Sequence, residues 1–333
     1  MSSAQTPDEI WKDARWLAQA VDPRAGLIRL VDMTPEAYRA ASFLDDRMFE
    51  QPRTSNLLQW DEVASSVPTD ARRDARWIFH IGHVGSTLVA RLLGELDSVL
   101  SVREPRAFRD ISFFPPEVRG RFVPTLQALF SRTFIPQQTC LLKATSFVSE
   151  IAAEMVPADG RALYLYATAQ SYISGILAGE NSRLELAGMA STRAERLASR
   201  GLRLPEARHE ADLAAAAWAC ETTSLEQAAG NAVLWLDFDH VLGDIEGSLH
   251  AIAKFFGFDA PDEQLSAIAS GPLTRRYSKA TEYEYSPELR RDLLAKANDL
   301  HRADIESALA MLDAASETAP LLRKALNRAQ AES

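Results

Sequence analysis

One stretch, residues 77–93, constrains the fold of this chain more than any other. It begins with an apolar run, WIFHI, whose β-forming residues predict a strand buried on both faces. Gly82 and Gly85 follow, then Ser86 and Thr87, and then a run with leucines on one face, which is typical of an amphipathic helix. Glycines let a backbone approach an anion closely, and the first N–H groups of a helix point at it with the positive end of the helix dipole. This order of elements predicts a phosphate-binding loop.

Two other interpretations of this stretch are an ordinary strand-to-helix turn and a Walker A loop. Strand-to-helix turns made of small residues are common, and in an ordinary turn Ser86 would simply cap the helix. A Walker A loop requires a lysine directly before the Ser or Thr, and this chain has Gly85 there. The pattern therefore disfavours an ordinary ATPase or GTPase and leaves open an anion site of another kind.

The heptapeptide GHVGSTL resembles the 5′-phosphosulfate loop of the sulfotransferases that use 3′-phosphoadenosine 5′-phosphosulfate (PAPS). His83 stands where many members have a basic residue, and Val84 stands where they have a serine. The resemblance implies that PAPS is bound by Gly82, His83, Val84, Gly85, Ser86 and Thr87. It also implies that His83 contacts the transferring sulfonate oxygens, whereas His80, inside the strand, is expected to be a core residue.

Charged residues stand at the ends of two further predicted strands, residues 99–102 and 140–143. Open α/β sheets place their sites at the carboxyl ends of their strands. Glu104 follows the first strand, and we expect it to be the general base that deprotonates the acceptor, with a surface ion pair as the alternative. Lys143 ends the second strand, where the resembling family has a lysine. We expect it either to reach the donor's phosphate or bridging oxygen, or to be a solvated lysine.

The expected site for the donor's 3′-phosphate departs from the family pattern. After the predicted strand at residues 161–166, the resemblance implies an arginine and then a serine, but this chain has Ala167. Ser174 matches the serine only if the alignment slips by one residue, and Ser171 is the second choice. Losing a bidentate guanidinium weakens binding of a terminal phosphate. A late basic stretch resembles the family's loop over the nucleotide and is expected to supply the missing charge through Arg276, Ser278 and Lys279, unless it is only a solvated loop.

Strands and helices alternate along most of the chain. The predicted strands are residues 77–81, 99–102, 140–143, 161–166 and 232–236. The resemblance implies an α/β protein with a three-layer P-loop NTPase-like fold and a parallel sheet of about five strands, and the alternation independently supports this expectation. Asp239, after the last strand, stands where the family commonly has Glu and is expected to order its loop.

We expect two domains, a mainly helical N-terminal cap over residues 1–75 and a P-loop domain over residues 76–333. Within the cap, residues 8–20 have helical spacing of apolar side chains, and residues 27–31 predict a strand. Thr34 and Pro35 predict the start of a second helix, and the polar residues 51–75 predict a connector.

Composition limits the partners. Of 333 residues, 47% are hydrophobic and 25% charged, which is ordinary for a globular protein with a sizeable core. A net charge of −10 argues against broad binding to nucleic acid or anionic membranes, and no segment predicts a membrane span. Cys140 and Cys220 lie in apolar segments, so we expect buried, unpaired thiols in a reducing compartment, the cytoplasm.

Together these patterns favour transfer of a sulfonate group from PAPS to a hydroxyl or amine on a small molecule, lipid or sugar. Glu104, His83 and Lys143 are the expected catalytic residues, and no ligand spacing predicts a metal. Two alternatives remain open. One is a phosphotransferase that uses ATP and Mg²⁺ at the same loop, with Asp237 or Asp239 holding the metal. The other is a nucleotide-binding protein without catalysis.

Overall fold

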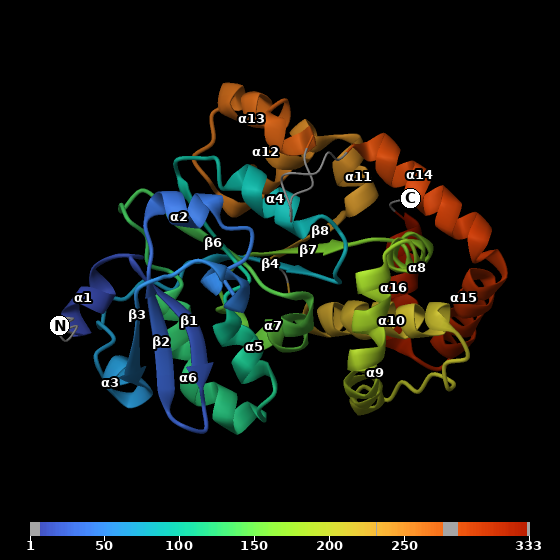
Figure 1. Ribbon diagram of the computed structural model, residues 1–333, viewed down its shortest axis with the longest axis horizontal. Coiled ribbons are helices and arrows are strands. Elements are labelled where there is room, and N and C mark those ends of the chain that lie inside the picture. The colour runs from blue at the N-terminus through green and yellow to red at the C-terminus, as the bar shows by residue number, and fades with distance from the viewer. Residues whose placement is uncertain (1–6, 231, 276–285, 332–333) are drawn as a thin grey trace.

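The computed structural model describes residues 7–230, 232–275 and 286–331 (Figure 1). Its main sheet has five parallel strands in the order β5-β6-β4-β7-β8. Their bounds are β4 Arg76–His80, β5 Val99–Arg103, β6 Thr139–Lys143, β7 Ala162–Tyr166 and β8 Val233–Asp237. The predicted α/β class and five-stranded parallel sheet are confirmed. Continuous apolar runs form these strands because helices cover both faces of the sheet and leave no polar face.

The strand that precedes the glycine loop, β4, lies at the centre of the sheet, between β6 and β7. After β4 the chain builds β5 and β6 on one side, and then crosses to build β7 and β8 on the other side. In open α/β sheets, the crevice at such a reversal of strand order is where ligands bind. The topology therefore places the glycine loop at the expected ligand crevice.

Helices cover both faces of this sheet. In Figure 1, α4 (Ser86–Leu93), α11 (Phe238–Gly243) and α12 (Ile245–Phe256) lie above the sheet, and α10 (Glu210–Ala228) lies below it. The remaining helices of the α/β part are α5 (Arg106–Ser112), α6 (Pro116–Leu129), α7 (Ala152–Met155), α8 (Ala169–Leu177), α9 (Glu180–Ser199), α13 (Asp262–Ala269), α14 (Pro287–Leu300), α15 (Arg302–Ser316) and α16 (Pro320–Ala331), with 3₁₀ turns η2 (Ser146–Ile151) and η3 (Pro272–Arg275). The core is continuous and includes Trp77, Phe79, Phe108 and Trp218.

The N-terminal region is not purely helical. Beside α1 (Pro7–Lys12), α2 (Pro35–Ala40), η1 (Asp46–Glu50) and α3 (Trp60–Ser65), it has an antiparallel sheet of β1 (Trp16–Asp22), β2 (Leu27–Asp32) and β3 (Ser55–Gln59). The strand predicted at residues 27–31 is confirmed, and so is the helix start, because the Thr34 side chain accepts a hydrogen bond from Ala37 N.

Two expectations for this region are wrong. The helix predicted over residues 8–20 ends at Lys12, because the next apolar run is a strand buried along most of its length. The connector predicted over residues 51–75 contains β3, whose side chains alternate between exposed and half-buried. This alternation is too weak to predict a strand from the sequence. The division into two domains at residue 75 stays a prediction.

Two arginines, the buried Arg103 and the half-buried Arg132, attach the N-terminal region to the α/β part. Arg103, at the end of β5, donates to the carbonyl oxygens of Tyr38, Arg39 and Ala41, with Nε 2.9 Å from Ala41 O. Arg132 donates to the carbonyl oxygens of Ile10 and Trp16, the latter at 2.6 Å. Each guanidinium thus satisfies backbone carbonyls of a segment distant in sequence.

The cysteines are as expected in one respect: Cys140 and Cys220 are buried and not bridged. Burial raises the pKa of each thiol to about 12, so both are protonated at neutral pH. Among the residues that the structure describes, no helix combines the length and the apolar character needed to cross a bilayer.

Candidate functional site

The loop between β4 and α4 has an unusual backbone, with positive φ angles at Gly82 (83°), His83 (54°) and Gly85 (59°). A non-glycine residue in this region is strained, and such strain is concentrated at functional sites. His80 fixes the start of the loop: its Nδ1 accepts from Gly82 N at 2.9 Å, and its Nε2 lies 3.0 Å from the carbonyl oxygen of Ala144. His80 is therefore a buried structural histidine, as predicted, with its proton on Nε2.

The helix that follows the loop begins without a side-chain cap. Its N-cap residue is Gly85, which has no side chain. Among the described residues, no side-chain capping hydrogen bond is formed at this end of the helix. Ser86 is the first helical residue, so the interpretation that Ser86 caps the helix is wrong. The first N–H groups of a helix lack intrahelical partners, so this end of α4 is suited to an anion. The Thr87 hydroxyl is buried and has no hydrogen-bond partner among the described residues.

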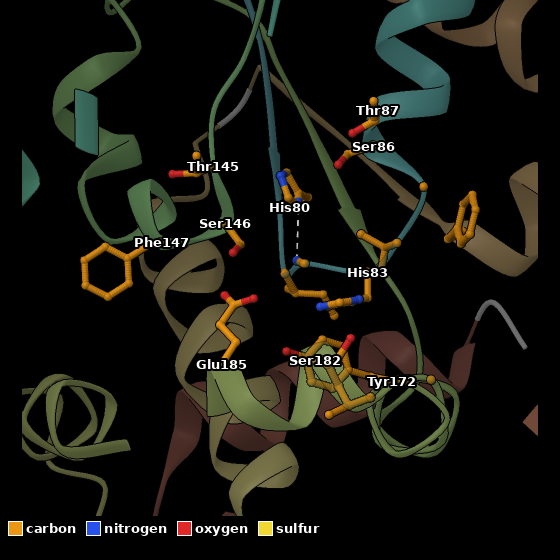
Figure 2. Close-up of a pocket in the computed structure, with 18 of the residues that line it drawn as sticks. His80, His83, Ser86, Thr87, Thr145, Ser146, Phe147, Tyr172, Ser182 and Glu185 are labelled. Carbon is orange, nitrogen blue, oxygen red and sulfur yellow. Dashed lines mark hydrogen bonds between the residues drawn. The ribbon is translucent and has the colours of Figure 1, made fainter. Parts of the chain in front are cut away.

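A cavity of about 640 Å³ opens at this loop. Its walls are the loop itself, the segment after β6, helices α8 and α9, and helix α14. Figure 2 shows His83 pointing into this space, with Ser146 on one side and Tyr172, Ser182 and Glu185 on the other. All six loop residues expected to bind the donor line the cavity: Gly82, His83, Val84, Gly85, Ser86 and Thr87.

An aromatic ring closes the other side of the loop. A Cβ atom added to Gly85 would lie 1.8 Å from the ring of Phe238, the first residue of α11. The guanidinium of Arg290 lies over the same ring, 4.9 Å from its centroid. Arg290 also pairs with Asp239 at 3.2 Å, and Asp239 accepts a hydrogen bond from Ser171. Asp239 thus links three segments, which fits the expectation that it orders its loop.

The two expected catalytic residues at strand ends form one charged cluster. Lys143 Nζ contacts Glu104 Oε1, and Arg47 lies 3.1 Å from the other carboxylate oxygen of Glu104. Arg47 also pairs with Asp45 at 2.6 Å. Glu104 lines the cavity, but Lys143 does not, and its side chain is only 1% exposed. Lys143 is therefore not a solvated lysine, and its ammonium contacts a residue that lines the cavity, Glu104.

Other expected contacts do not meet at the cavity. Ser174 is fully buried, and its Oγ lies 2.8 Å from Gln170 O and 2.9 Å from Asn298 Oδ1 of α14. Ser174 is not a lining residue, because its hydroxyl faces α14, and the structure does not bring it together with the loop residues expected to bind the donor. Ser171, the second choice, is held by Asp239. Arg276, Ser278 and Lys279 lie outside the described residues.

Several lining residues were not found from the sequence. Phe43, Asp45 and Arg47 come from the N-terminal region, for which the sequence indicates no chemistry. For Arg193 the sequence leaves two alternatives open, because the arginine-bearing segment at residues 180–230 fits either an acceptor wall or a solvated helix face, and the structure places Arg193 at the cavity. The N-terminal residues reach the cavity because the chain after α2 is fixed by Arg103, and Leu44 N donates to Arg103 O at 2.8 Å. Their sequence neighbourhood carries no motif that marks them.

Comparisons with known proteins give a limited picture. No protein-family model matches the chain, and no curated protein matches it. Solved structures with some similarity include the mouse sulfotransferase SULT7A1 complexed with PAP, at 13% identity, a TM-score of 0.40, and coverage of 83% of this chain and 97% of that one. Another is a sulfotransferase domain from the curacin biosynthetic pathway, at 12% identity, a TM-score of 0.39, and coverage of 67% and 89%.

A third is a sulfotransferase from Alicyclobacillus acidocaldarius, at 15% identity, a TM-score of 0.35, and coverage of 71% of this chain and 96% of that one. All three TM-scores lie below 0.5, so these likenesses carry no weight for the activity of this chain. What the chain does must be inferred from its own loop and cavity.

Proposed function

We propose that this protein transfers a sulfonate group from PAPS to a hydroxyl or amine of an acceptor bound in the cavity. One observation carries the proposal: the uncapped N-terminus of α4 opens into a cavity at the carboxyl end of the central strand. That position collects helix-end N–H groups, the positive end of the helix dipole and the hydroxyls of Ser86 and Thr87. These groups fit the 5′-phosphosulfate of the donor.

Two orphaned hydroxyls support the fit to an oxygen-rich anion. Thr87 Oγ1 and Thr145 Oγ1 are buried atoms without a hydrogen-bond partner among the described residues, and both residues line the cavity. A buried hydroxyl without a partner destabilises the fold, so native proteins rarely retain one. Phosphate or sulfonate oxygens would supply the missing partners.

In the proposed reaction, the acceptor oxygen or nitrogen forms a bond to sulfur while the bond from sulfur to the bridging phosphate oxygen breaks. The bonding electrons pass to the 5′-phosphate, and the acceptor's proton passes to a base. His83 faces the transferring group and donates to its oxygens, and the helix N-terminus stabilises the charge that develops on the phosphate. Lys143 acts through Glu104, because it does not line the cavity.

The base must be a carboxylate or histidine that faces the cavity. Glu104 is the residue that we propose, and it is held by Lys143 and Arg47. Glu185 is a second carboxylate, which Figure 2 shows directed toward Ser146. Parallel Glu104→Gln and Glu185→Gln variants decide between them: loss of turnover with donor affinity retained identifies the base.

A phosphotransferase that uses ATP and Mg²⁺ is the second candidate, and the geometry favours it less. Asp237 Oδ1 accepts from Asp239 N at 2.7 Å and from His240 N at 3.3 Å, and so caps α11. Asp239 is engaged by Arg290 and Ser171. Both carboxylates proposed for the metal thus have structural partners, and Gly85 occupies the position of the Walker lysine.

Thermal shift and calorimetry with adenosine 3′,5′-bisphosphate, and separately with ATP and Mg²⁺, test the proposal. We expect stabilisation by the bisphosphate alone. Thr87→Val should fold normally, because it removes an orphaned hydroxyl, yet bind the bisphosphate about tenfold more weakly, since one charge-assisted hydrogen bond is lost. Thr87→Ser, which keeps the hydroxyl, is the matched control. Stabilisation by Mg-ATP alone would overturn the proposal, and bisphosphate binding without transfer of labelled sulfonate to any acceptor would favour a non-catalytic protein.

A further inference from the structure

The wall of the cavity formed by α9 carries a buried cation. Arg193, on α9, lines the cavity with a side chain that is 7% exposed. Its Nε and Nη1 atoms are buried and make no hydrogen bond to any residue that the structure describes. A guanidinium has five N–H donors and remains charged in proteins, so leaving some of them unpartnered is costly. A ligand acceptor oxygen in the cavity would remove that cost.

The nearest counter-charge neutralises Arg193 only in part. Glu221, on α10, has Oε1 3.6 Å from Arg193 Nε, which is too far for a hydrogen bond. Burial raises the pKa of the Glu221 carboxyl to about 7, against the opposing effect of Arg193, so it is partly protonated near neutral pH. Two further carboxylates lie near this wall: Glu150, which is half-buried and pairs with Arg200 at 2.7 Å and Arg196 at 3.8 Å, and Glu185 of α9, which lines the cavity. Because Glu221 is partly protonated, Arg193, Arg196 and Arg200 outweigh these carboxylates. This wall therefore presents net positive charge.

Exposed apolar side chains also line the cavity. Phe113 and Phe147 lie with ring centroids 5.0 Å apart, and Phe113 is 61% exposed. Leu289 and Leu293 of α14 are about half exposed, and both line the cavity. Exposed apolar side chains gathered around a cavity mark a surface that an apolar ligand covers.

We propose that the acceptor has an apolar body and a carboxylate, and that Arg193 binds this carboxylate. A planar carboxylate matches the guanidinium fork with two parallel hydrogen bonds, and it carries one charge into the cavity, where a phosphate dianion would cost more to desolvate. A cationic acceptor is disfavoured because Arg193 repels it. This inference rests on the proposed function only in naming the ligand as the acceptor; the carboxylate subsite itself stands on the geometry.

Three eight-carbon probes test the subsite directly: octanoate, octanol and octylamine, titrated into the full protein by ligand-observed NMR. We expect octanoate to bind at least about tenfold more tightly than octanol, and octylamine to bind most weakly. Arg193→Gln should reduce the affinity for octanoate to that for octanol, and Arg193→Lys should retain part of the preference for octanoate over octanol. Arg183→Gln is the matched control, because Arg183 lies on the same helix, pairs with Glu210 at 3.2 Å and does not line the cavity.

Equal affinity for octanoate and octanol in the unaltered protein would overturn the inference, as would an octanoate preference that survives Arg193→Gln. Should Arg193→Gln not fold, the probe series on the unaltered protein and on Arg193→Lys remains decisive. The same variants are titrated with adenosine 3′,5′-bisphosphate, and we expect no change in its affinity. If Arg193→Gln weakens binding of the bisphosphate but not binding of octanoate, Arg193 binds the nucleotide and the inference is wrong. Failure of the bisphosphate to bind at all, with the octanoate preference intact, would instead reject the proposed donor alone.

Discussion

Two glycines of the loop after β4 have left-handed backbone angles, but their surroundings differ. A Cβ atom on Gly82 would lie 3.5 Å from Ser146 Oγ, an ordinary contact, whereas a Cβ atom on Gly85 would collide with the Phe238 ring at 1.8 Å. At the residue scale, Gly82 is required only by its φ angle. Gly85 is required both by its φ angle and by the close approach of an aromatic ring.

These two glycines give a matched pair of substitutions. Gly82→Ala should lower the free energy of unfolding by about 1–2 kcal/mol, the cost of a left-handed angle for an L-residue. Gly85→Ala should cost a further ~1–3 kcal/mol from overpacking against Phe238. Urea denaturation measures both, and in a Phe238→Ala background, itself destabilised by the loss of a buried ring, Gly85→Ala should cost only the first part. Equal losses at the two glycines would mean that the ring moves aside freely.

The buried carboxyl of Glu221 makes stability depend on pH. Burial raises its pKa from the ordinary value of 4.5 to about 7, so the folded state binds this proton more tightly than the unfolded chain. The free energy of unfolding should therefore fall as the pH rises from about 4.5 to about 7, by at most about 1.4 kcal/mol per pH unit.

The Glu221→Gln variant should not show this decrease in the free energy of unfolding with rising pH. Measured by urea denaturation, the stability of the variant relative to the unaltered protein should improve by roughly 2–3 kcal/mol between pH 5 and pH 8. Glu195→Gln, an exposed site on α9, should show no such change. A difference that is independent of pH would show that Glu221 is already ionised throughout this range.

At the element scale, the ends of β5 and β6 are held together by charge as well as by the sheet. Glu104 N donates to Lys143 O at 2.8 Å, and the Lys143 ammonium contacts the Glu104 carboxylate. Removing one partner of a buried ion pair leaves the other unpaired, which is strongly destabilising.

Glu104→Gln should therefore lower the free energy of unfolding by about 3–5 kcal/mol, because Lys143 stays buried. The double variant Glu104→Gln, Lys143→Met should recover much of that loss, and a double-mutant cycle by urea denaturation measures the coupling. Additive losses would mean that the pair contributes no coupling energy. Turnover of Lys143→Met compared with that of the double variant then reports on the proposed role of Glu104 as base.

The elements differ in how far the sequence predicts them. The five parallel strands were predictable because strands buried on both faces read as continuous apolar runs, and so was the loop, whose residues all lie in one stretch. The β1 strand was misread as a continuation of helix because Leu17 also fits helical spacing, and its pairing with β2 is a tertiary effect. The contact between Glu104 and Lys143 needed the order of strands, which spacing alone does not give.

At the scale of the whole molecule, the N-terminal region forms part of the cavity. It contributes Phe43, Asp45 and Arg47, and its backbone is held by Arg103. Nothing local in the sequence indicates this, because the arginine and the carbonyls that it binds are separated by about sixty residues. For Arg193 the sequence could not decide between an acceptor wall and a solvated helix face, since its burial depends on the packing of α9 against α10.

Arg103 and Arg132 allow a test of this long-range role. Both bind carbonyls of the N-terminal region, but only the segment bound by Arg103 leads into the cavity wall. Arg103→Lys and Arg132→Lys should each destabilise the fold, because a lysine cannot bind several carbonyls in one plane. Only Arg103→Lys should speed amide hydrogen exchange around residues 41–47 and weaken ligand binding. Similar effects of both variants would mean that the region responds as one unit.

The central claim is that the amide groups opening α4 bind the phosphosulfate of the donor. A crystal structure of the protein with adenosine 3′,5′-bisphosphate tests it most directly. We predict the 5′-phosphate within hydrogen-bonding distance of the backbone nitrogens of Ser86 and Thr87 and of the Thr87 hydroxyl. A nucleotide bound elsewhere, with this end of α4 left to water, would contradict the account.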